Sequence, residues 1–228
     1  MTRKGECFTF SRRQASDFAK QVADDFNPIH NEDAKRFCVP GDLLFSFLLS
    51  RVGLHQKMQC TFSGMVGGDL ALRLDEAENE VRILDEAGKE YLDVRFEGER
   101  SQDMALIEHL VRRYVRFSGQ NFPHILGPLM EKHQVMVNPA RPLVMYQSMA
   151  VSLERLDLKA PEVVLSGAEL EVVGKRGNVT LYFNFVEDDL VVGTGEKQMV
   201  LSGLVPFDQA GMDGMVALYH SLKAQYQG

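Results

Sequence analysis

The spacing of apolar residues changes along the chain from helical periodicity to strand-like alternation. One helical face is predicted between residues 11 and 26, and Ser11 with Gln14 forms a capping-box signature at its start. Residues 42–52 are apolar nearly all round, which is typical of a buried helix, and Gly53 is placed to end that helix. The apolar positions on the first helical face are Ala15, Phe18, Ala19, Val22, Ala23 and Phe26.

Alternating segments follow residue 53 and return in the second half of the chain. The strands expected in the first half are residues 59–66, 70–74, 80–85 and 90–97, with a hairpin connection at 85–89. Helices are expected over residues 102–116, 122–133 and 212–226. The strands expected in the second half are residues 143–156, 163–173, 178–186 and 197–205.

This order of elements repeats one plan, a helix followed by antiparallel strands. It predicts an α+β architecture of two antiparallel sheets, each wrapped around a central helix. The expected boundary lies near Phe117, which divides the chain into domains 1–117 and 118–228.

Composition and charge exclude several classes of protein. The net charge is −7 and no long basic run occurs, so a nucleic-acid partner is not expected. No apolar run approaches the roughly 20 residues of a membrane helix, and the N-terminus lacks the apolar core of a signal peptide. Three cysteines without a C-x-x-C spacing argue against a disulfide framework and a structural zinc site. We therefore expect a cytoplasmic protein with reduced thiols and no metal.

The segment Asp25-Phe26-Asn27-Pro28-Ile29-His30 holds the strongest candidate chemistry in the chain. Pro28 fixes its own φ and disfavours helix at Asn27, so the segment is predicted to turn. A turn brings the Asp25 carboxylate and the His30 imidazole into one small space, where they form a candidate acid/base pair. Each residue taken alone also has a structural interpretation, because Asp and Asn-Pro are common in turns.

The element Asp25-x-Asn27-Pro28-x-His30, followed by Gly41-x-Leu43 at the start of an apolar helix, resembles the MaoC-like hydratases. These are (R)-specific enoyl-CoA hydratases and dehydratases of the hotdog fold. The resemblance covers roughly residues 6–66. It implies a double hotdog whose N-terminal half keeps the motif and whose C-terminal half is degenerate. Asn121-Phe122-Pro123-His124 is the candidate remnant in that second half.

The resemblance implies a role for each residue of the motif. His30 would take a proton from water as the water attacks C3 of a 2-enoyl thioester, and Asp25 would deliver a proton to C2. Asn27 would orient the loop or the water. The backbone N–H of Gly41, at a helix N-terminus, would polarise the thioester carbonyl. The reaction is reversible hydration and needs no cofactor, with CoA or phosphopantetheine as the substrate's carrier.

Two neighbours of Gly41 depart from the family pattern. Pro40 stands where the family usually has His, and Asp42 stands where it usually has an apolar residue. Asp42 is expected to be an N-cap that occupies the N–H groups of the helix. This favours the alternative of a catalytically weak acyl-thioester binding or regulatory protein. Hydrolysis by an acyl-thioesterase is a third possibility.

The remaining expectations concern the surroundings of the motif and the assembly. Pro28, Pro40 and Asp42 are predicted to contact substrate. Lys35 and Arg36 are predicted to meet the phosphates of the carrier, with a solvated face as the alternative interpretation. The expected partner is an acyl thioester, and the chain is expected to act as a monomeric double hotdog or as a homodimer. Cys38, near the motif, is interpreted as a buried thiol and not a nucleophile.

Overall fold

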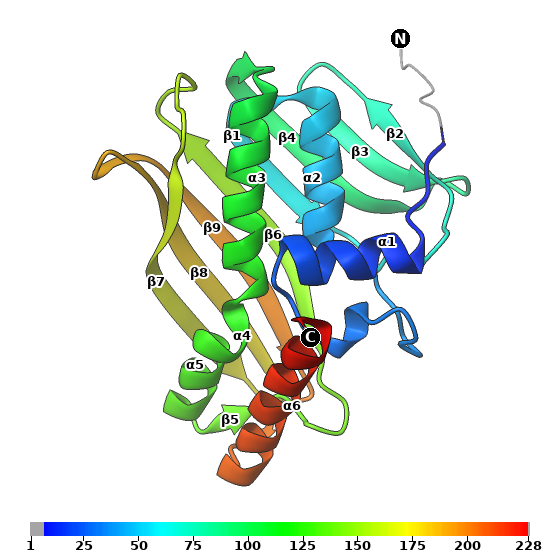
Figure 1. Cartoon of the computed structure of the whole chain (residues 1–228), viewed down its shortest axis with the longest axis vertical. Helices are drawn as coiled ribbons and strands as arrows, with labels where there is room; N and C mark the ends of the chain where they lie inside the picture. Colours follow the sequence, from blue (N-terminus) through cyan, green and yellow to red (C-terminus); the bar gives the residue numbers. More distant parts are fainter. Residues whose placement is uncertain (1–6, 228) are drawn as a thin grey trace.

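A single long antiparallel sheet dominates the computed structural model, which describes residues 7–227 (Figure 1). Its strands are β1 (Leu54–Phe62), β2 (Leu72–Glu76), β3 (Glu80–Asp85), β4 (Glu90–Ser101), β6 (Val144–Leu153), β7 (Glu162–Val173), β8 (Arg176–Glu187) and β9 (Leu190–Ser202). They lie in the order β2-β3-β4-β1-β6-β9-β8-β7. A second sheet pairs only β5 (Val135–Met136) with β10 (Val205–Pro206).

The two halves of the chain meet at the centre of the long sheet. β1 pairs with β6 in antiparallel register, with Met58 opposite Val151 and Cys60 opposite Met149. The prediction of two separate antiparallel sheets was therefore wrong, because backbone hydrogen bonds between β1 and β6 close the edge that each half would otherwise expose. The predicted division at Phe117 falls in the last turn of a helix and stays a prediction.

Two long helices lie side by side on one face of this sheet, as Figure 1 shows. They are α2 (Gly41–Val52) and α3 (Met104–Gly119). Apolar side chains at helical spacing, such as Leu44 and Leu48 on α2, are buried there. The Phe45 and Tyr114 rings meet edge to face with centroids 5.6 Å apart, which joins the two helices. Along the chain, each of these two helices precedes four strands of the long sheet.

The other helices lie around this core. They are α1 (Arg12–Asp17), the π-helix η1 (Phe18–Val22), the 3-10 helix η2 (Pro28–His30), α4 (Asn121–His124), α5 (Leu126–Lys132) and α6 (Gln209–Gln227). The expected helix over residues 122–133 is the pair α4 and α5, broken at Ile125. No helix in the described part of the chain is long and apolar enough to cross a bilayer.

The capping box at Ser11 and Gln14 is confirmed, since each residue's side chain bonds the other's backbone N–H at 3.0–3.1 Å. Gly53 ends α2 as predicted, with φ of 85°. These local signals depend on neighbouring residues alone, which is why the sequence reveals them.

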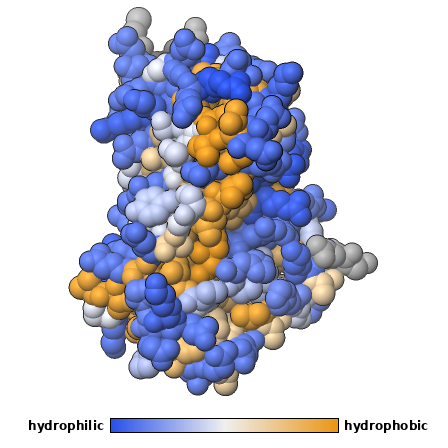
Figure 2. All heavy atoms as spheres, turned by 90° about the vertical axis from the view of Figure 1, so that its left-hand side faces the viewer, coloured by the Kyte–Doolittle hydropathy of each residue, from blue (hydrophilic) through white to orange (hydrophobic). Residues whose placement is uncertain are grey.

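An apolar band crosses the face that Figure 2 presents, which is the side of the edge strand β7. Exposed apolar residues in this part of the sheet include Val164 and Leu165 on β7, and Leu190 and Val191 at the start of β9. Because β7 is an edge strand, its outward backbone groups are available to a second strand. This edge is the feature of the fold that bears on the expected homodimer.

The end of α3 approaches the loop after η1 more closely than any side chain would allow. A Cβ built on Gly119 would lie 2.0 Å from the Ala23 carbonyl oxygen and 3.0 Å from Cβ of Asp25. Glycine is therefore required at this crossing for packing, since its own φ is ordinary. The contact fixes the loop that carries Asp25 against the body of the protein.

We predict that Gly119→Ala destabilises the protein by about 1–3 kcal/mol, because the new methyl group forces backbone apart. Chemical unfolding monitored by circular dichroism measures the loss. Gly127→Ala is the matched control, since a Cβ there meets nothing within 4 Å and alanine favours helix. Equal stability of the two variants would contradict the proposed crossing.

Candidate functional site

A cavity of about 470 Å³ lies where the loop from Asp25 to His30 meets the N-terminus of α2. All residues of that loop line it, together with Pro40, Gly41 and Asp42. The end of α3, strands β6 and β9, and helix α6 complete the wall. The structure therefore gathers the motif and the helix start, which are separate in sequence, around one space.

Asp24 turns the chain into this cavity in a left-handed conformation, with φ of 53°. Such a conformation is unfavourable for a residue with a side chain and persists only where its surroundings hold it. Oδ2 of Asp24 accepts hydrogen bonds from Gln120 at 2.7 Å and Lys223 at 2.6 Å. The Tyr219 hydroxyl donates to the Asp24 carbonyl oxygen at 3.0 Å. The start of α4 and the helix α6 thus set the direction in which Asp25 points.

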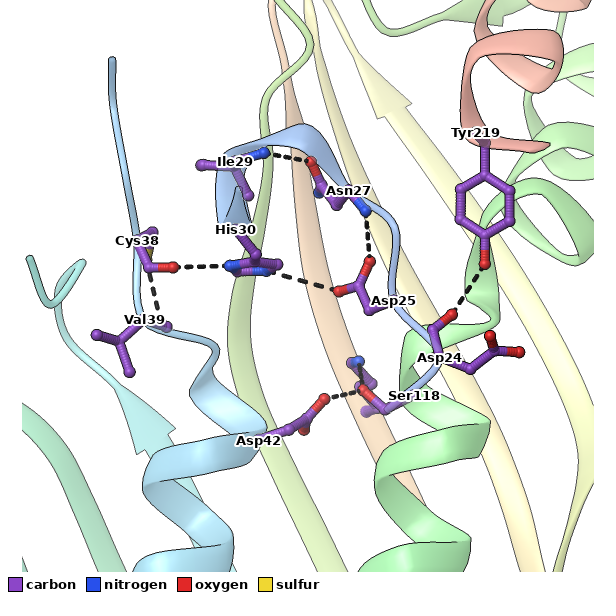
Figure 3. A network of polar contacts seen from close by, with 11 residues as sticks. Asp24, Asp25, Asn27, Ile29, His30, Cys38, Val39, Asp42, Ser118 and Tyr219 are labelled. Atoms are coloured by element: carbon purple, nitrogen blue, oxygen red, sulfur yellow. Dashed lines mark hydrogen bonds and ion pairs between the residues drawn. The ribbon is translucent and has the colours of Figure 1, made fainter. Parts of the chain in front are cut away.

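Asp25 and His30 face each other across the turn (Figure 3), with Oδ2 of Asp25 3.5 Å from Nε2 of His30. The other carboxylate oxygen, Oδ1, accepts the Asn27 backbone N–H at 2.8 Å. Nδ1 of His30 lies 2.7 Å from the Cys38 carbonyl oxygen. A carbonyl oxygen only accepts, so Nδ1 carries a hydrogen, and Nε2 is the ring nitrogen that faces Asp25. One carboxylate oxygen and one basic nitrogen are therefore free to act on the same proton.

Asn27 and Pro28 shape the turn. Oδ1 of Asn27 accepts the Ile29 N–H at 3.2 Å and caps the 3-10 helix η2, whose first residue is Pro28. The Asn27 side chain is therefore part of the turn, and its role toward a bound water stays a prediction. Both residues line the cavity.

Gly41 begins α2, and Pro40 precedes it as the N-cap residue. The first backbone N–H groups of α2, at Gly41 and Asp42, have no acceptor within the described residues. These groups carry the positive end of the helix dipole. A Cβ on Gly41 would lie 2.9 Å from the Phe62 ring and 3.1 Å from the Tyr146 ring. Glycine allows this aromatic pair to pack against the helix start.

Asp42 does not cap α2, so the N-cap prediction was wrong. Its side chain turns inward, where Oδ2 accepts a hydrogen bond from Ser118 Oγ at 2.5 Å. Lys197 of β9 donates to the same Ser118 hydroxyl from the other side. The buried Asp42 carboxylate is stabilised there by a hydroxyl and an ammonium group. These interactions are more favourable for it than capping the helix at an exposed position. The helix N–H groups consequently stay free of the Asp42 side chain.

Burial determines the titration of this polar cluster. Loss of water raises the pKa of Asp42 above its usual range, an effect that the Lys197 charge and the Ser118 hydrogen bond oppose. Loss of water also lowers the pKa of Lys197, which the charges of Asp42 and Asp25 oppose. Nζ of Lys197 lies 4.2 Å from the centroid of the Tyr146 ring, a cation–π contact.

The remaining predicted residues lie outside the polar centre. Lys35 and Arg36 are exposed and do not line the cavity, so the structure does not bring them to the motif. Cys38 borders the cavity, but burial raises its pKa to about 11, against activation as a nucleophile. His124 of the candidate remnant is exposed, whereas Asn121 is buried on the cavity wall.

Sequence reasoning missed Ser118 and Lys197 as members of the site. Lys197 occupies an inward position of β9, two residues before buried Met199 and four before buried Leu201. A lysine within such an alternating apolar series was the available signal. Ser118 gave no signal, because a serine near the end of an amphipathic helix is unremarkable in sequence.

The chain belongs to the family described as "Protein of unknown function (DUF3581)", whose model matches residues 1–210. No curated protein matches the sequence.

Several solved structures are similar. A "MaoC-like dehydratase" is 8% identical, with 86% of this chain and 96% of that chain covered and a TM-score of 0.48. An acyl-ACP thioesterase from Bacteroides thetaiotaomicron is 9% identical, with 87% and 97% covered and a TM-score of 0.44. The peroxisomal multifunctional enzyme type 2 from Drosophila melanogaster is 11% identical, with 86% and 48% covered and a TM-score of 0.49. At these identities and scores, function is inferred from the geometry of the site alone.

We predict that alkylating agents at pH 8 modify exposed Cys7 and spare Cys38 and Cys60. A pKa of about 11 lowers the thiolate fraction of Cys38 roughly a hundredfold against a thiol of pKa 9.0. Burial raises the pKa of Cys60 further still. Intact and peptide mass spectrometry count the adducts, and a urea-unfolded sample, in which all three react, is the control. Rapid native labelling of Cys38 would contradict the closed environment described for it.

Lys197→Met is expected to lower the free energy of unfolding by about 3–5 kcal/mol, because it leaves the Asp42 carboxylate buried without its cation. Without Lys197 the folded pKa of Asp42 rises further, and stability is lost as pH rises through that pKa. The deficit measured by urea unfolding should therefore be larger at pH 8 than at pH 5. The double variant Asp42→Asn/Lys197→Met should recover part of the loss.

Lys57→Met is the control for this experiment, since the Lys57 side chain is 65% exposed and its partner Glu97 is 78% exposed. A Lys197→Met variant as stable as this control at both pH values would show that the buried charges are not coupled.

Proposed function

We propose that this member of the DUF3581 family is a double-hotdog hydro-lyase that reversibly adds water to trans-2-enoyl thioesters. The observation that supports it best is the pairing of Oδ2 of Asp25 with Nε2 of His30 at 3.5 Å on the wall of a cavity. The fold is consistent with a double hotdog, because a long helix followed by four strands occurs twice along the chain and all eight strands share one sheet.

The pair is suited to hold and split one water. At 3.5 Å the two atoms leave no strong direct hydrogen bond, and both are free of other partners among the described residues. His30 takes a proton from the water as its oxygen bonds to C3 of the enoyl group. That proton passes from Nε2 of His30 to Oδ2 of Asp25, which delivers it to C2, so one water supplies both the hydroxyl and the hydrogen that are added. General acid–base catalysis of this kind contributes about 10²–10⁴-fold to a rate.

The start of α2 supplies the second requirement, a donor for the enolate oxygen that develops on the thioester. The backbone N–H groups of Gly41 and Asp42 have no acceptor within residues 7–227 and border the same cavity as the pair. Asp42 does not obstruct them, because its carboxylate bonds Ser118 and its charge faces Lys197. The carrier is CoA or phosphopantetheine, and no cofactor enters the reaction.

The alternative of binding without catalysis depended on Asp42 closing the helix start, and that contact is not made. Hydrolysis uses the same water and the same pair, with attack on the carbonyl carbon in place of C3. The product distinguishes the two reactions, since hydrolysis releases a thiol and hydration removes the conjugated double bond.

We expect purified protein to consume short and medium trans-2-enoyl-CoA esters, followed by loss of the conjugated absorbance. Asp25→Asn and His30→Ala should each lower kcat/KM by about 10²–10⁴-fold, because each removes one partner of the proton transfer. A thiol reagent in parallel reports release of free CoA.

Asp33→Asn and His124→Ala are the matched controls, since both residues are exposed and lie outside the cavity. Release of thiol with the absorbance unchanged would replace hydration with hydrolysis. No turnover with any chain length or carrier would refute the proposed enzyme.

A further inference from the structure

Arg176, in the second half of the chain, borders the same cavity as the Asp25–His30 pair, and the proposed reaction does not use its charge. It is the first residue of β8. Its backbone lies opposite Val173 of β7 and Ser202 of β9, so two neighbouring strands fix its position. The Arg176 side chain is exposed, which places this cation where the cavity opens to water.

The guanidinium group of Arg176 has free hydrogen-bond donors. Its Nε donates to Oδ1 of Asn178 at 3.2 Å, and both terminal nitrogens lack a partner within the described residues. Glu171 lies on the neighbouring strand opposite Asn178, yet no carboxylate of residues 7–227 comes within 4.0 Å of the guanidinium. The two terminal nitrogens of an arginine match the two oxygens of a carboxylate, so Arg176 is suited to bind an anionic group of a ligand.

Two further cations flank Arg176. Lys175 precedes it, and Arg141 lies two residues before Leu143, whose carbonyl oxygen accepts the N–H of Ser202. Both side chains are exposed, and neither forms an ion pair within the part of the chain that the structure describes. Neighbouring cations attract anions to a surface, so they add to the effect of Arg176 in a chain whose net charge is −7.

Arg176 is distant from the polar centre of the site. Lys197 marks that centre, because its ammonium contacts Ser118, and it lies five residues before Ser202 on β9. A strand advances about 3.4 Å per residue, so about 17 Å of strand separates Lys197 from the partner of Arg176. An extended carbon chain, with bonds of about 1.5 Å, advances roughly 1.3 Å per bond. A chain of roughly 10–13 bonds therefore covers the span, given that the arginine side chain itself is long.

The cavity wall along this span is apolar. Met199 and Val200 follow the polar centre on β9, and Met130 of α5 and Met215 of α6 line the same cavity. Such a wall suits the hydrocarbon part of an acyl chain. It suits a pantetheine arm less, because the two amides of that arm would leave water without gaining hydrogen bonds.

The carrier has a separate way out of the cavity. Ser63, Gly64 and Met65, which follow β1, line the cavity and are exposed. They lie in the first half of the chain, as does the helix start at Gly41 that would hold the thioester carbonyl. A substrate whose carrier leaves on this side directs its acyl chain toward Arg176.

We propose that Arg176 binds a carboxylate at the far end of the acyl chain, so that the cavity prefers the thioester of a long dicarboxylic acid to that of a plain fatty acid. The placement of the thioester end rests on the proposed function. The anion site itself rests on the unpaired guanidinium and the apolar wall that leads to it. Arg176 is a specificity residue and takes no part in the proton transfer.

Titration calorimetry with saturated esters tests this preference, because a saturated chain cannot be hydrated. Dodecanoyl-CoA is compared with dodecanedioyl-CoA, which differs by the terminal carboxylate, and free thiol is monitored so that any hydrolysis is detected. We expect the dicarboxylic ester to bind about 3–10-fold more tightly, because only it pairs with the exposed arginine. The preference should shrink at high salt, which screens exposed charges. Pentanoyl-CoA and glutaryl-CoA should bind alike, since the short chain does not reach Arg176.

Variants at position 176 separate binding of the carboxylate from other effects. Arg176→Gln should abolish the preference and leave the affinity for dodecanoyl-CoA unchanged, and Arg176→Glu should reverse the preference by repelling the carboxylate. Arg176→Lys keeps the charge and should keep part of the preference, which tests the site again should the glutamine variant not fold. Arg36→Gln is the matched control, because Arg36 is exposed and lies outside the cavity.

Two outcomes would overturn the carboxylate site. The first is equal binding of dodecanoyl-CoA and dodecanedioyl-CoA by the unchanged protein. The second is equal weakening of both esters by Arg176→Gln that disappears with N-acetylcysteamine esters, which would assign the arginine to the phosphates of the carrier. A preference for the dicarboxylic ester without any hydratase activity would support the site and refute the proposed reaction instead.

Discussion

The buried contact of Asp42, Ser118 and Lys197 is the interaction on which the candidate site depends. It joins the first turn of α2, the last turn of α3 and the middle of β9, three elements that come from different parts of the chain. Charges buried this deeply are costly unless they are matched. Because Ser118 and Lys197 match Asp42, its carboxylate stays away from the helix start, and the N–H groups of α2 remain free. The position of Ser118 therefore determines whether the N-terminus of α2 is open or capped by Asp42.

The acid/base pair depends on a second constraint, which acts on backbone. Gly119 lets α3 touch the Ala23 carbonyl, and Asp24 holds a left-handed conformation beside it. Lys223 and Tyr219 of α6 bind Asp24 from the opposite side. The loop is therefore clamped between α3 and the C-terminal helix before it reaches Asp25. Such support matters because general acid–base catalysis depends on the position of its groups within hydrogen-bond reach.

The sequence revealed those features that short-range chemistry determines. The capping box at Ser11, the end of α2 at Gly53 and the strand Glu80–Asp85 are all as predicted. The gathering of Asp25, His30 and Gly41 around one cavity followed from the motif and its resemblance to a known family. Long-range pairing could not be predicted from the sequence, because no local pattern shows that β1 pairs with β6 or that Ser118 contacts Asp42. Asp42 was misjudged for this reason: a helix start predicts a cap, and only tertiary contact offers the carboxylate another partner.

The costs to stability are concentrated at one place in the fold. Asp24 has an unfavourable backbone conformation, Lys197 is buried beneath the cavity, and Asn121 has an unpaired amide. An apolar residue in place of Asn121 would relieve its cost, and Lys197 could be replaced by an apolar residue only together with Asp42. Departures from local rules of this kind are expected where a protein binds or reacts with a ligand. Asp25 and His30 satisfy their local rules as turn residues, so their own geometry is weaker evidence for function than the unsatisfied groups around them. It is this costly surrounding that argues for a working site over a structural turn.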